Sequence, residues 1–251
     1  MAFDAYSRSY DLLYRNKDYA SEARYIVALM KQHESAPEHL LEIGCGTGGH
    51  AREFSRMGLT VTGIDASEGM VAEARRRSRG TDGLEFQVAS STSFLVERIF
   101  PAAVSLFHVM SYHTSNEVFL AALCNVAKHL QPRGLFVFDC WHGPGVLSDP
   151  PSVRVTRMED DRCQVLRIAE PTMRWSENVV HVDFEVHVRE ATSGRVEVIR
   201  ELHPMRFFFR PELELFLQCA GFVLEGWYPW LQSSGTPGPD SWYAVAVARK
   251  A

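Results

Sequence analysis

Residues 40–49 read LLEIGCGTGG, an apolar run that ends in a series of glycines. The apolar start is typical of a buried strand, and residues 48–57 after it place Ala51, Phe54 and Met57 at helical spacing. Glycines between a strand and a helix let the backbone turn tightly and approach a ligand, with the helix N-terminus just behind. The stretch therefore predicts a ligand site at the end of a first strand.

The same alternation continues on the C-terminal side of this loop, to about residue 141. Strands are expected at 60–65, 84–89, 102–107 and 134–141, and helices at 67–78 and 117–130. Strands that alternate with helices form a parallel sheet with right-handed crossovers. The fold class is α/β, a Rossmann-like doubly wound sheet.

The pattern changes at residues 143–152, GPGVLSDPPS, which are rich in glycine and proline and indicate a break. Three long stretches with alternating apolar residues follow, at 163–170, 178–190 and 195–209, and predict an antiparallel β insertion after the fifth strand. One of its faces is apolar: Val180, Val182, Phe184, Val186 and Val188. The expected organisation is an N-terminal helical cap (1–38), a cofactor-binding core (39–142), the insertion as a lid over the acceptor region (143–209), and a closing helix and hairpin (210–251).

Composition excludes several classes of protein. The 251 residues carry 26 Lys and Arg against 31 Asp and Glu, a formal net charge of −5, which gives no general affinity for nucleic acid. No apolar run is long enough to cross a membrane, and the first residues do not resemble a signal peptide. Five scattered cysteines without a CxxC pair indicate reduced thiols and no zinc site. We expect a cytoplasmic protein without a bound metal.

Asp65 ends the second predicted strand, about 20 residues beyond the glycine loop, where an acidic side chain can bind ribose hydroxyls. Loop and acid together predict a site for a cofactor that contains adenosine. Gly44, Gly46 and Gly49 also satisfy GxGxxG, so the residues alone leave a nicotinamide cofactor open.

These motifs resemble those of class I S-adenosylmethionine-dependent methyltransferases: LLEIGCGTG, then VTGIDAS with Met70, and a helix ending in AGF before a final hairpin. The resemblance implies S-adenosylmethionine as cofactor. Gly44 and Gly46 would face its methionine part, Asp65 its ribose, and Ala66 and Met70 its ribose and adenine. Where many members carry Gly-Asp for the adenine amino group, this chain has Ala89-Ser90-Ser91, so Ser90 or Ser91 would accept that bond. The further residues expected at the cofactor are Glu42, Cys45 and Phe107.

A narrower resemblance rests on YDLLYRNKDYASEA near the N-terminus and on the β insertion followed by RFFF. Both are similar to bacterial methyltransferases that act on amino groups of nucleotide-linked deoxysugars. This likeness implies that Tyr10 and Tyr19 help to close the cofactor pocket. Ordinary helix packing is the alternative for each tyrosine.

The acceptor is expected beyond the carboxyl ends of the fourth and fifth strands. Residues 107–113, FHVMSYH, are unusually polar for a strand exit. By position in the sugar methyltransferase family Tyr112 is the expected substrate contact, with His113 as an adjacent base. His108 is expected to pack locally. At the fifth strand's exit, Asp139 could meet a cationic amine, with a cap of the loop that follows as its alternative.

Three other side chains are candidate substrate contacts. Trp141 could support a sugar ring, and His142 could serve as another base. Arg206 could bind a phosphate or carboxylate, with a surface ion pair as its alternative. The sequence thus predicts methyl transfer to a small polar molecule, most simply the amine of an activated deoxysugar. The alternatives are a small-molecule O-methyltransferase, a nicotinamide-dependent reductase and a non-catalytic cofactor-binding module. The expected partner is a small-molecule acceptor, and a homodimer is a candidate assembly.

Overall fold

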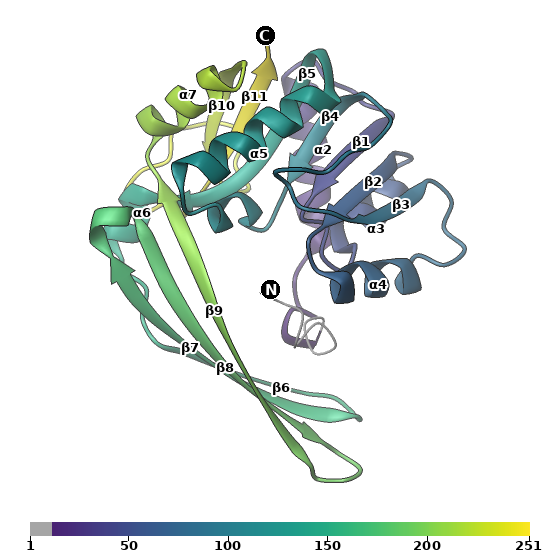
Figure 1. Ribbon diagram of the computed structural model, residues 1–251, viewed down its shortest axis with the longest axis vertical. Helices are drawn as coiled ribbons and strands as arrows, with labels where there is room; N and C mark the ends of the chain where they lie inside the picture. Colours follow the sequence, from purple (N-terminus) through teal and green to yellow (C-terminus); the bar gives the residue numbers. More distant parts are fainter. Residues whose placement is uncertain (1–11) are drawn as a thin grey trace.

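The computed structural model describes residues 12–251, in which eleven strands form one branched sheet (Figure 1). Its central part is parallel, in the order β3-β2-β1-β4-β5, and the antiparallel hairpin of β10 and β11 pairs with the far edge of β5. The strands of this part are β1 (His39–Ile43), β2 (Thr60–Asp65), β3 (Leu84–Val88), β4 (Phe100–Ser105), β5 (Leu130–His142), β10 (Phe222–Pro229) and β11 (Tyr243–Lys250). The predicted Rossmann-like α/β class is confirmed.

Helices cover both faces of this sheet. One face packs against α5 and α7, and the other against α2, α3 and α4. The helices are α2 (Tyr19–Gln32), α3 (Gly49–Arg56), α4 (Glu68–Arg77), α5 (Asn116–His129), α6 (Gly143–Ser148) and α7 (Arg210–Cys219), with short 3-10 turns η1 (Val109–Tyr112) and η2 (Trp175–Glu177). None of the helices in residues 12–251 is long and apolar enough to cross a membrane.

The residues after β5 form four long antiparallel strands in the order β9-β8-β7-β6, which extend away from the core as a twisted ribbon (Figure 1). They are β6 (Arg154–Glu159), β7 (Cys163–Arg174), β8 (Val179–Glu190) and β9 (Val196–Phe208). β9 joins the core by pairing in parallel with the last two residues of β5, Trp141 with Phe207 and His142 with Phe208. One edge of β5 pairs with β11 along most of its length. β9 of the insertion therefore pairs with the opposite edge, beyond the part of that edge that pairs with β4.

Local sequence explains where several elements begin. The Ser67 hydroxyl accepts a hydrogen bond from the backbone N–H of Met70 and starts α4, as an N-cap serine should. Pro144 lies in the first turn of α6, so residues expected to be only a break contain a short helix. The sequence pattern also missed β6, because its side chains are mostly charged or exposed.

Candidate functional site

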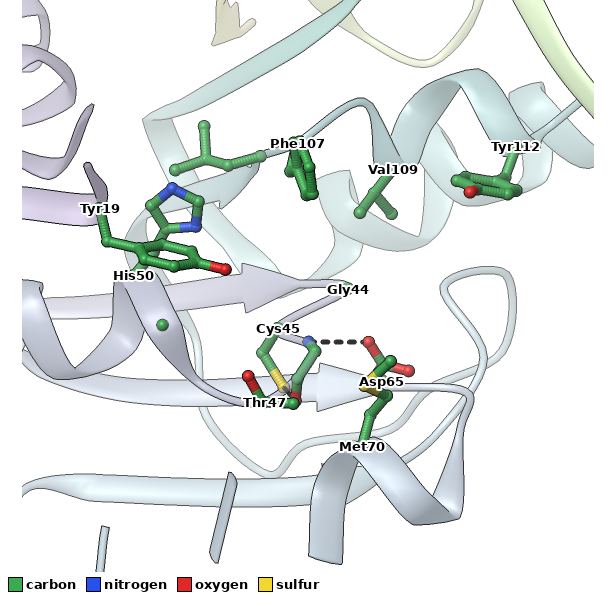
Figure 2. Close-up of a pocket in the computed structure, with 13 residues that line it drawn as sticks. Tyr19, Gly44, Cys45, Thr47, His50, Asp65, Met70, Phe107, Val109 and Tyr112 are labelled. Atoms are coloured by element: carbon green, nitrogen blue, oxygen red, sulfur yellow. Dashed lines mark hydrogen bonds between the residues drawn. The ribbon is translucent and has the colours of Figure 1, made fainter. Parts of the chain in front are cut away.

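The glycine loop after β1 forms the floor of a first cavity, the cofactor cavity (Figure 2). Gly44 and Gly46 have φ of +72° and +53°, a left-handed conformation that favours glycine. A Cβ at Gly44 would clash with Val109, whereas nothing lies within 4 Å of a Cβ position at Gly46. The chain therefore leaves open space at Gly46 that a ligand can approach.

Asp65, at the end of β2, holds this loop in shape. Its Oδ2 accepts the backbone N–H of Gly46 at 2.8 Å, drawn in Figure 2, and its Oδ1 accepts that of Ser67 at 2.8 Å. The side chain lines the cofactor cavity.

A chain of ionisable groups lies beneath the loop. Lys17 Nζ is 2.5 Å from Glu22 Oε1, and Glu22 Oε2 is 2.6 Å from His50 Nε2. Burial opposes the charge on Glu22, yet His50 and Lys17 together hold its pKa below the ordinary value. His50 is itself buried, and this burial lowers its pKa.

Glu42 ends this chain, with Oε1 at 3.9 Å from His50 Nδ1. Burial, with a smaller effect of Asp65, raises the pKa of Glu42 to about 8. Its Oε2 is buried and has no hydrogen-bond partner in the described part of the chain. An unpaired buried carboxyl oxygen is costly, which points to a ligand group as its missing partner.

The structure brings together most of the residues predicted to bind the cofactor. Tyr19 packs over the loop, where its ring would clash with any Cβ at Gly49. The predicted residues that line this cavity are Tyr19, Gly44, Cys45, Gly46, Asp65, Met70 and Phe107. Glu42 lies buried below it, whereas Ala66, Ser90 and Ser91 do not line it. Tyr10 falls outside the described residues.

S-adenosylmethionine fits these residues. The cofactor has ribose hydroxyls for a strand-end acid, a methionine part that needs close backbone approach, and a positive charge that an acidic surrounding tolerates. Asp65 supplies the strand-end acid, and Gly46 supplies the open approach. Glu42 supplies a carboxyl oxygen without a protein partner in residues 12–251.

A second cavity of about 270 Å³, the acceptor cavity, lies between the core and the insertion. Val180, Val182 and Val186 of β8 are buried on the inward face of the insertion, as their alternation predicted, and Phe184 and Val188 on that face are partly buried. Aromatic side chains dominate its wall, and Trp141 and Trp242 meet edge to face at 5.0 Å. The ionisable side chains of the wall are Tyr14, His108, Tyr112, Arg154, Arg167, His203 and Tyr243.

The two cavities share Phe107 and Tyr112, so ligands bound in both cavities would meet at these residues. Phe107 and His108 have φ of +66° and +63°, which is uncommon for residues with a side chain. Backbone strain of this kind collects at functional sites. The strained turn leaving β4 sets both side chains against the acceptor cavity.

Asp139 holds that turn from the neighbouring strand β5. Its two carboxylate oxygens accept the backbone N–H of His108 at 3.1 and 3.2 Å, and its Oδ2 lies 2.5 Å from His108 Nδ1. Burial opposes the charge of this fully buried group, but the contacts with His108 keep its pKa below the ordinary value. Asp139 was expected to meet an amine directly. The structure instead encloses it behind His108.

Tyr112 is tied to the insertion. Its hydroxyl lies 3.0 Å from Nδ1 of the buried His203, whose Nε2 lies 3.1 Å from Glu201 Oε2. Burial raises the pKa of Tyr112 well above its usual value. The phenol therefore keeps its proton and can orient an acceptor by hydrogen bonding.

Two arginines give the acceptor cavity a positive charge. Arg167 donates to the Tyr14 hydroxyl at 2.8 Å, and its guanidinium lies 4.9 Å from the centre of the Phe184 ring. Arg154 is exposed and forms no ion pair with residues 12–251. No Asp or Glu among the described residues lines this cavity.

Three predicted substrate contacts lie elsewhere. His113 turns back into the core, with Nδ1 facing the Met110 carbonyl and Nε2 facing the Ser91 hydroxyl at 2.6 Å. His142 points to the opposite side of β5 from Trp141, toward the Ser241 carbonyl. Arg206 is on the opposite face of β9 from His203, buried over Phe208 and Phe216 near Glu212. It forms an ion pair with Glu212 at 3.6 Å, as its alternative expected, although the guanidinium is buried and not at the surface, and it is not part of the cavity wall.

Four residues line the acceptor cavity that the sequence did not place there: His108, which was expected to pack locally and does stack on Tyr243, and Arg154, Arg167 and His203. The signal for His108 was present: a histidine and an aspartate lie at the exits of adjacent strands, so they share one edge of the sheet. The other three depend on the register of the insertion, which no local motif fixes.

Comparisons with known proteins agree with this geometry. A methyltransferase domain family matches residues 40–134. The chain is 30% identical over 86% of its length, and 89% of the other, to dTDP-3-amino-3,4,6-trideoxy-alpha-D-glucopyranose N,N-dimethyltransferase of Streptomyces venezuelae. It is 29% identical over 86% of its length, and 83% of the other, to dTDP-3-amino-3,6-dideoxy-alpha-D-glucopyranose N,N-dimethyltransferase of Streptomyces fradiae.

A solved structure agrees as well. That of Streptomyces venezuelae DesVI superimposes with a TM-score of 0.79 at 27% identity, over 97% of this chain and 98% of that one. The glycine loop, Asp65 and the closing hairpin occupy the positions that the sequence motifs predicted, and the relationship gives no support to a nicotinamide-dependent reductase. The chain belongs to the class I S-adenosylmethionine-dependent methyltransferases.

Proposed function

We propose that this methyltransferase acts on the amino group of a nucleotide-linked deoxysugar and adds two methyl groups. The names of the relatives support this substrate, because both similar enzymes are N,N-dimethyltransferases of dTDP-amino sugars. The match to each covers most of both chains.

The charge and shape of the acceptor cavity are the main observation that supports this proposal. It is lined by Arg154 and Arg167 and by no carboxylate among residues 12–251, so it suits an acceptor with an anionic end. A guanidinium matches phosphate oxygens in charge and geometry. Trp141 and Trp242 offer apolar faces for a sugar or base ring. A nucleotide diphosphate attached to a sugar has these three features.

When bound, S-adenosylmethionine supplies an activated methyl group on a positively charged sulfur. The protein must place the amine nitrogen in line with that methyl and keep water away. Phe107 and Tyr112, which border both cavities, are the residues that would align the two ligands. Tyr112 is held by His203, so its hydroxyl presents a fixed hydrogen-bonding group.

We further propose that the enzyme works in the cytoplasm on this small molecule and does not act on nucleic acid. The absence of a strong positive net charge supports the second point. A homodimer remains a candidate assembly, which size-exclusion chromatography with light scattering would test.

The test is product analysis with two matched acceptors, a dTDP-linked amino deoxysugar and the same compound with a hydroxyl at the amino position. Mass spectrometry should show successive gain of two methyl groups on the amino sugar and none on the hydroxyl compound. Methylation of the hydroxyl compound at an equal rate would favour the O-methyltransferase alternative. No product from either would exclude this substrate class.

A further inference from the structure

We propose that His108 accepts the proton of the acceptor ammonium, and that Asp139 is the residue that positions it. This inference rests on the proposed function, because it concerns the form in which the amine reacts. An ammonium ion has no lone pair and cannot attack a methyl group. A site for N-methylation of a charged amine therefore gains from a nearby proton acceptor.

His108 has the position that this role requires. It lines the acceptor cavity one residue after Phe107, which borders both cavities. Its ring stacks on Tyr243 of β11, with centroids 4.2 Å apart and planes 16° apart. The stacking on Tyr243 and the hydrogen bonds from the His108 backbone N–H to Asp139 together fix the ring in place.

Asp139 determines which ring nitrogen is available. Its Oδ2 lies 2.5 Å from His108 Nδ1, a buried nitrogen with no hydrogen bond of its own to residues 12–251, so the negative charge of the carboxylate favours the tautomer with the proton on Nδ1. The lone pair is then on Nε2. No hydrogen bond joins this nitrogen to another group among residues 12–251, so it is available to the acceptor.

The other candidates in the region are less suited to accept a proton. Tyr112 keeps its own proton, because burial raises its pKa. Both ring nitrogens of His203 are already partnered, by Tyr112 and by Glu201. His113 and His142 face away from the cavity.

The proposed reaction moves one proton and one methyl group. The substrate ammonium transfers one proton to Nε2 of His108, which leaves a neutral amine and an imidazolium that Asp139 stabilises. The amine nitrogen then forms a bond to the methyl carbon as the carbon–sulfur bond breaks, with its electron pair retained by sulfur. The products are a methylated ammonium and S-adenosylhomocysteine. His108 returns its proton to solvent before the next transfer.

Several other groups near His108 contribute to any pH dependence. Lys17 is positively charged and helps to keep Asp139 ionised. The remaining ionisable groups of the same cavity are Tyr14, Tyr112, Arg154, Arg167, His203 and Tyr243. A pH profile must therefore be read as a difference between wild type and a variant, which cancels the contributions they share.

The kinetic test compares wild type, His108→Gln and a control, His187→Gln, on the dTDP-amino sugar from about pH 6 to about pH 9. His187 also has a carboxylate partner, Glu185 at 2.6 Å, but lies outside the acceptor cavity. Loss of a general base costs about 100-fold or more in kcat. We expect that loss near neutral pH for His108→Gln, and wild-type rates for the control.

The pH trend separates a proton acceptor from a structural residue. The deficit of His108→Gln should shrink as pH rises, because more of the amine arrives neutral, and cofactor affinity should not change. A deficit of equal size at every pH, or no deficit, would overturn the proposal while the proposed function stands. Failure of wild type to methylate any amino sugar would instead overturn the proposed function.

A spectroscopic measurement tests the pair of His108 and Asp139, first on the wild-type protein without turnover and then on a variant. Long-range proton–nitrogen NMR spectra should show the neutral His108 ring protonated at Nδ1. Asp139→Asn should alter that tautomer balance and lower kcat, with a pH-dependent deficit like that of His108→Gln. A neutral wild-type ring protonated at Nε2 would overturn the proposal whatever the substrate is.

Discussion

Glu42 is a carboxyl group buried beneath the glycine loop, and this placement makes stability depend on pH. Burial first, and Asp65 second, raise its pKa from 4.5 to about 8 in the folded protein. Between those values the folded state holds a proton that the unfolded chain has released. Stability from this group is therefore complete below about pH 4.5 and is lost as pH rises to about 8.

We predict that Glu42→Gln removes this loss. As pH rises from 5 to 8, the free energy of unfolding of the variant should increase relative to that of wild type, by at most about 1.4 kcal/mol per pH unit. Urea unfolding at several pH values measures the difference. Glu38→Gln is the control, because Glu38 is exposed just before β1. Parallel profiles for wild type and Glu42→Gln would show that Glu42 ionises normally.

Gly46 gives the sharpest test of the cofactor cavity. A side chain there meets no protein atom within 4 Å but enters the open space at the loop, so Gly46→Val should abolish S-adenosylhomocysteine binding. Backbone strain at φ of +53° will also cost about 1–2 kcal/mol of stability. Calorimetric titration measures the first effect and thermal unfolding the second.

The matched control is Gly58→Val. Gly58 also has a positive φ, +89°, and open space around its Cβ position, but it follows α3 outside the cavity. It should show a similar loss of stability with unchanged cofactor binding. Equal binding by both variants would contradict the assignment of the glycine loop.

Asp65 should contribute both to the loop and to the ligand. We expect Asp65→Ala to weaken S-adenosylhomocysteine binding about ten- to a hundredfold, the effect of losing a charge-assisted hydrogen bond of about 1.5–3 kcal/mol. Titration of the folded variant measures it. An unchanged dissociation constant would remove the ribose assignment.

At the scale of elements, the core was predictable because each strand and helix carries its own periodic pattern. The first five strands and α3 to α5 lie at or close to the positions that apolar spacing indicated. The cofactor side of the site followed, because Gly44, Gly46 and Asp65 belong to motifs local in the sequence.

The acceptor side was harder to predict, because it depends on strand register. In the observed pairing Val180 lies opposite Met205 and Val182 opposite His203, so even residues of β8 share a face with odd residues of β9. A shift of one residue would instead place Arg206 inward. Only the long-range pairing decides that His203 reaches the cavity and that Arg206 is buried on the other face.

Arg154 tests whether the insertion recognises an anion. Arg154→Ala should raise KM for a dTDP-amino sugar about tenfold or more by loss of a charged contact, with little change in cofactor affinity. Arg200→Ala is the control, since Arg200 is an exposed arginine of the insertion paired with Glu185. Steady-state kinetics measure both. Identical KM values would exclude Arg154 as a phosphate contact.

In the whole molecule, core residues line most of the cofactor cavity, and the acceptor cavity lies between the core and the insertion. The two cavities share Phe107 and Tyr112. The earlier expectation paired Tyr112 with His113 as the acceptor contact. The structure keeps Tyr112 at the junction and places His113 against Ser91 in the core. Of the residues at this strand exit, Tyr112 and His108 are the two that line the acceptor cavity beside Phe107, and we propose that they make the catalytic contribution.

The central claim is that the amine of a nucleotide-linked sugar is the methyl acceptor at this junction. The most direct measurement uses S-adenosylmethionine with a carbon-13 methyl group and follows the label by NMR on a dTDP-amino sugar. The label should appear on nitrogen, first as a monomethyl and then as a dimethyl amine, in a reaction that Gly46→Val abolishes. Label on a hydroxyl oxygen, or transfer that Gly46→Val leaves intact, would contradict the claim.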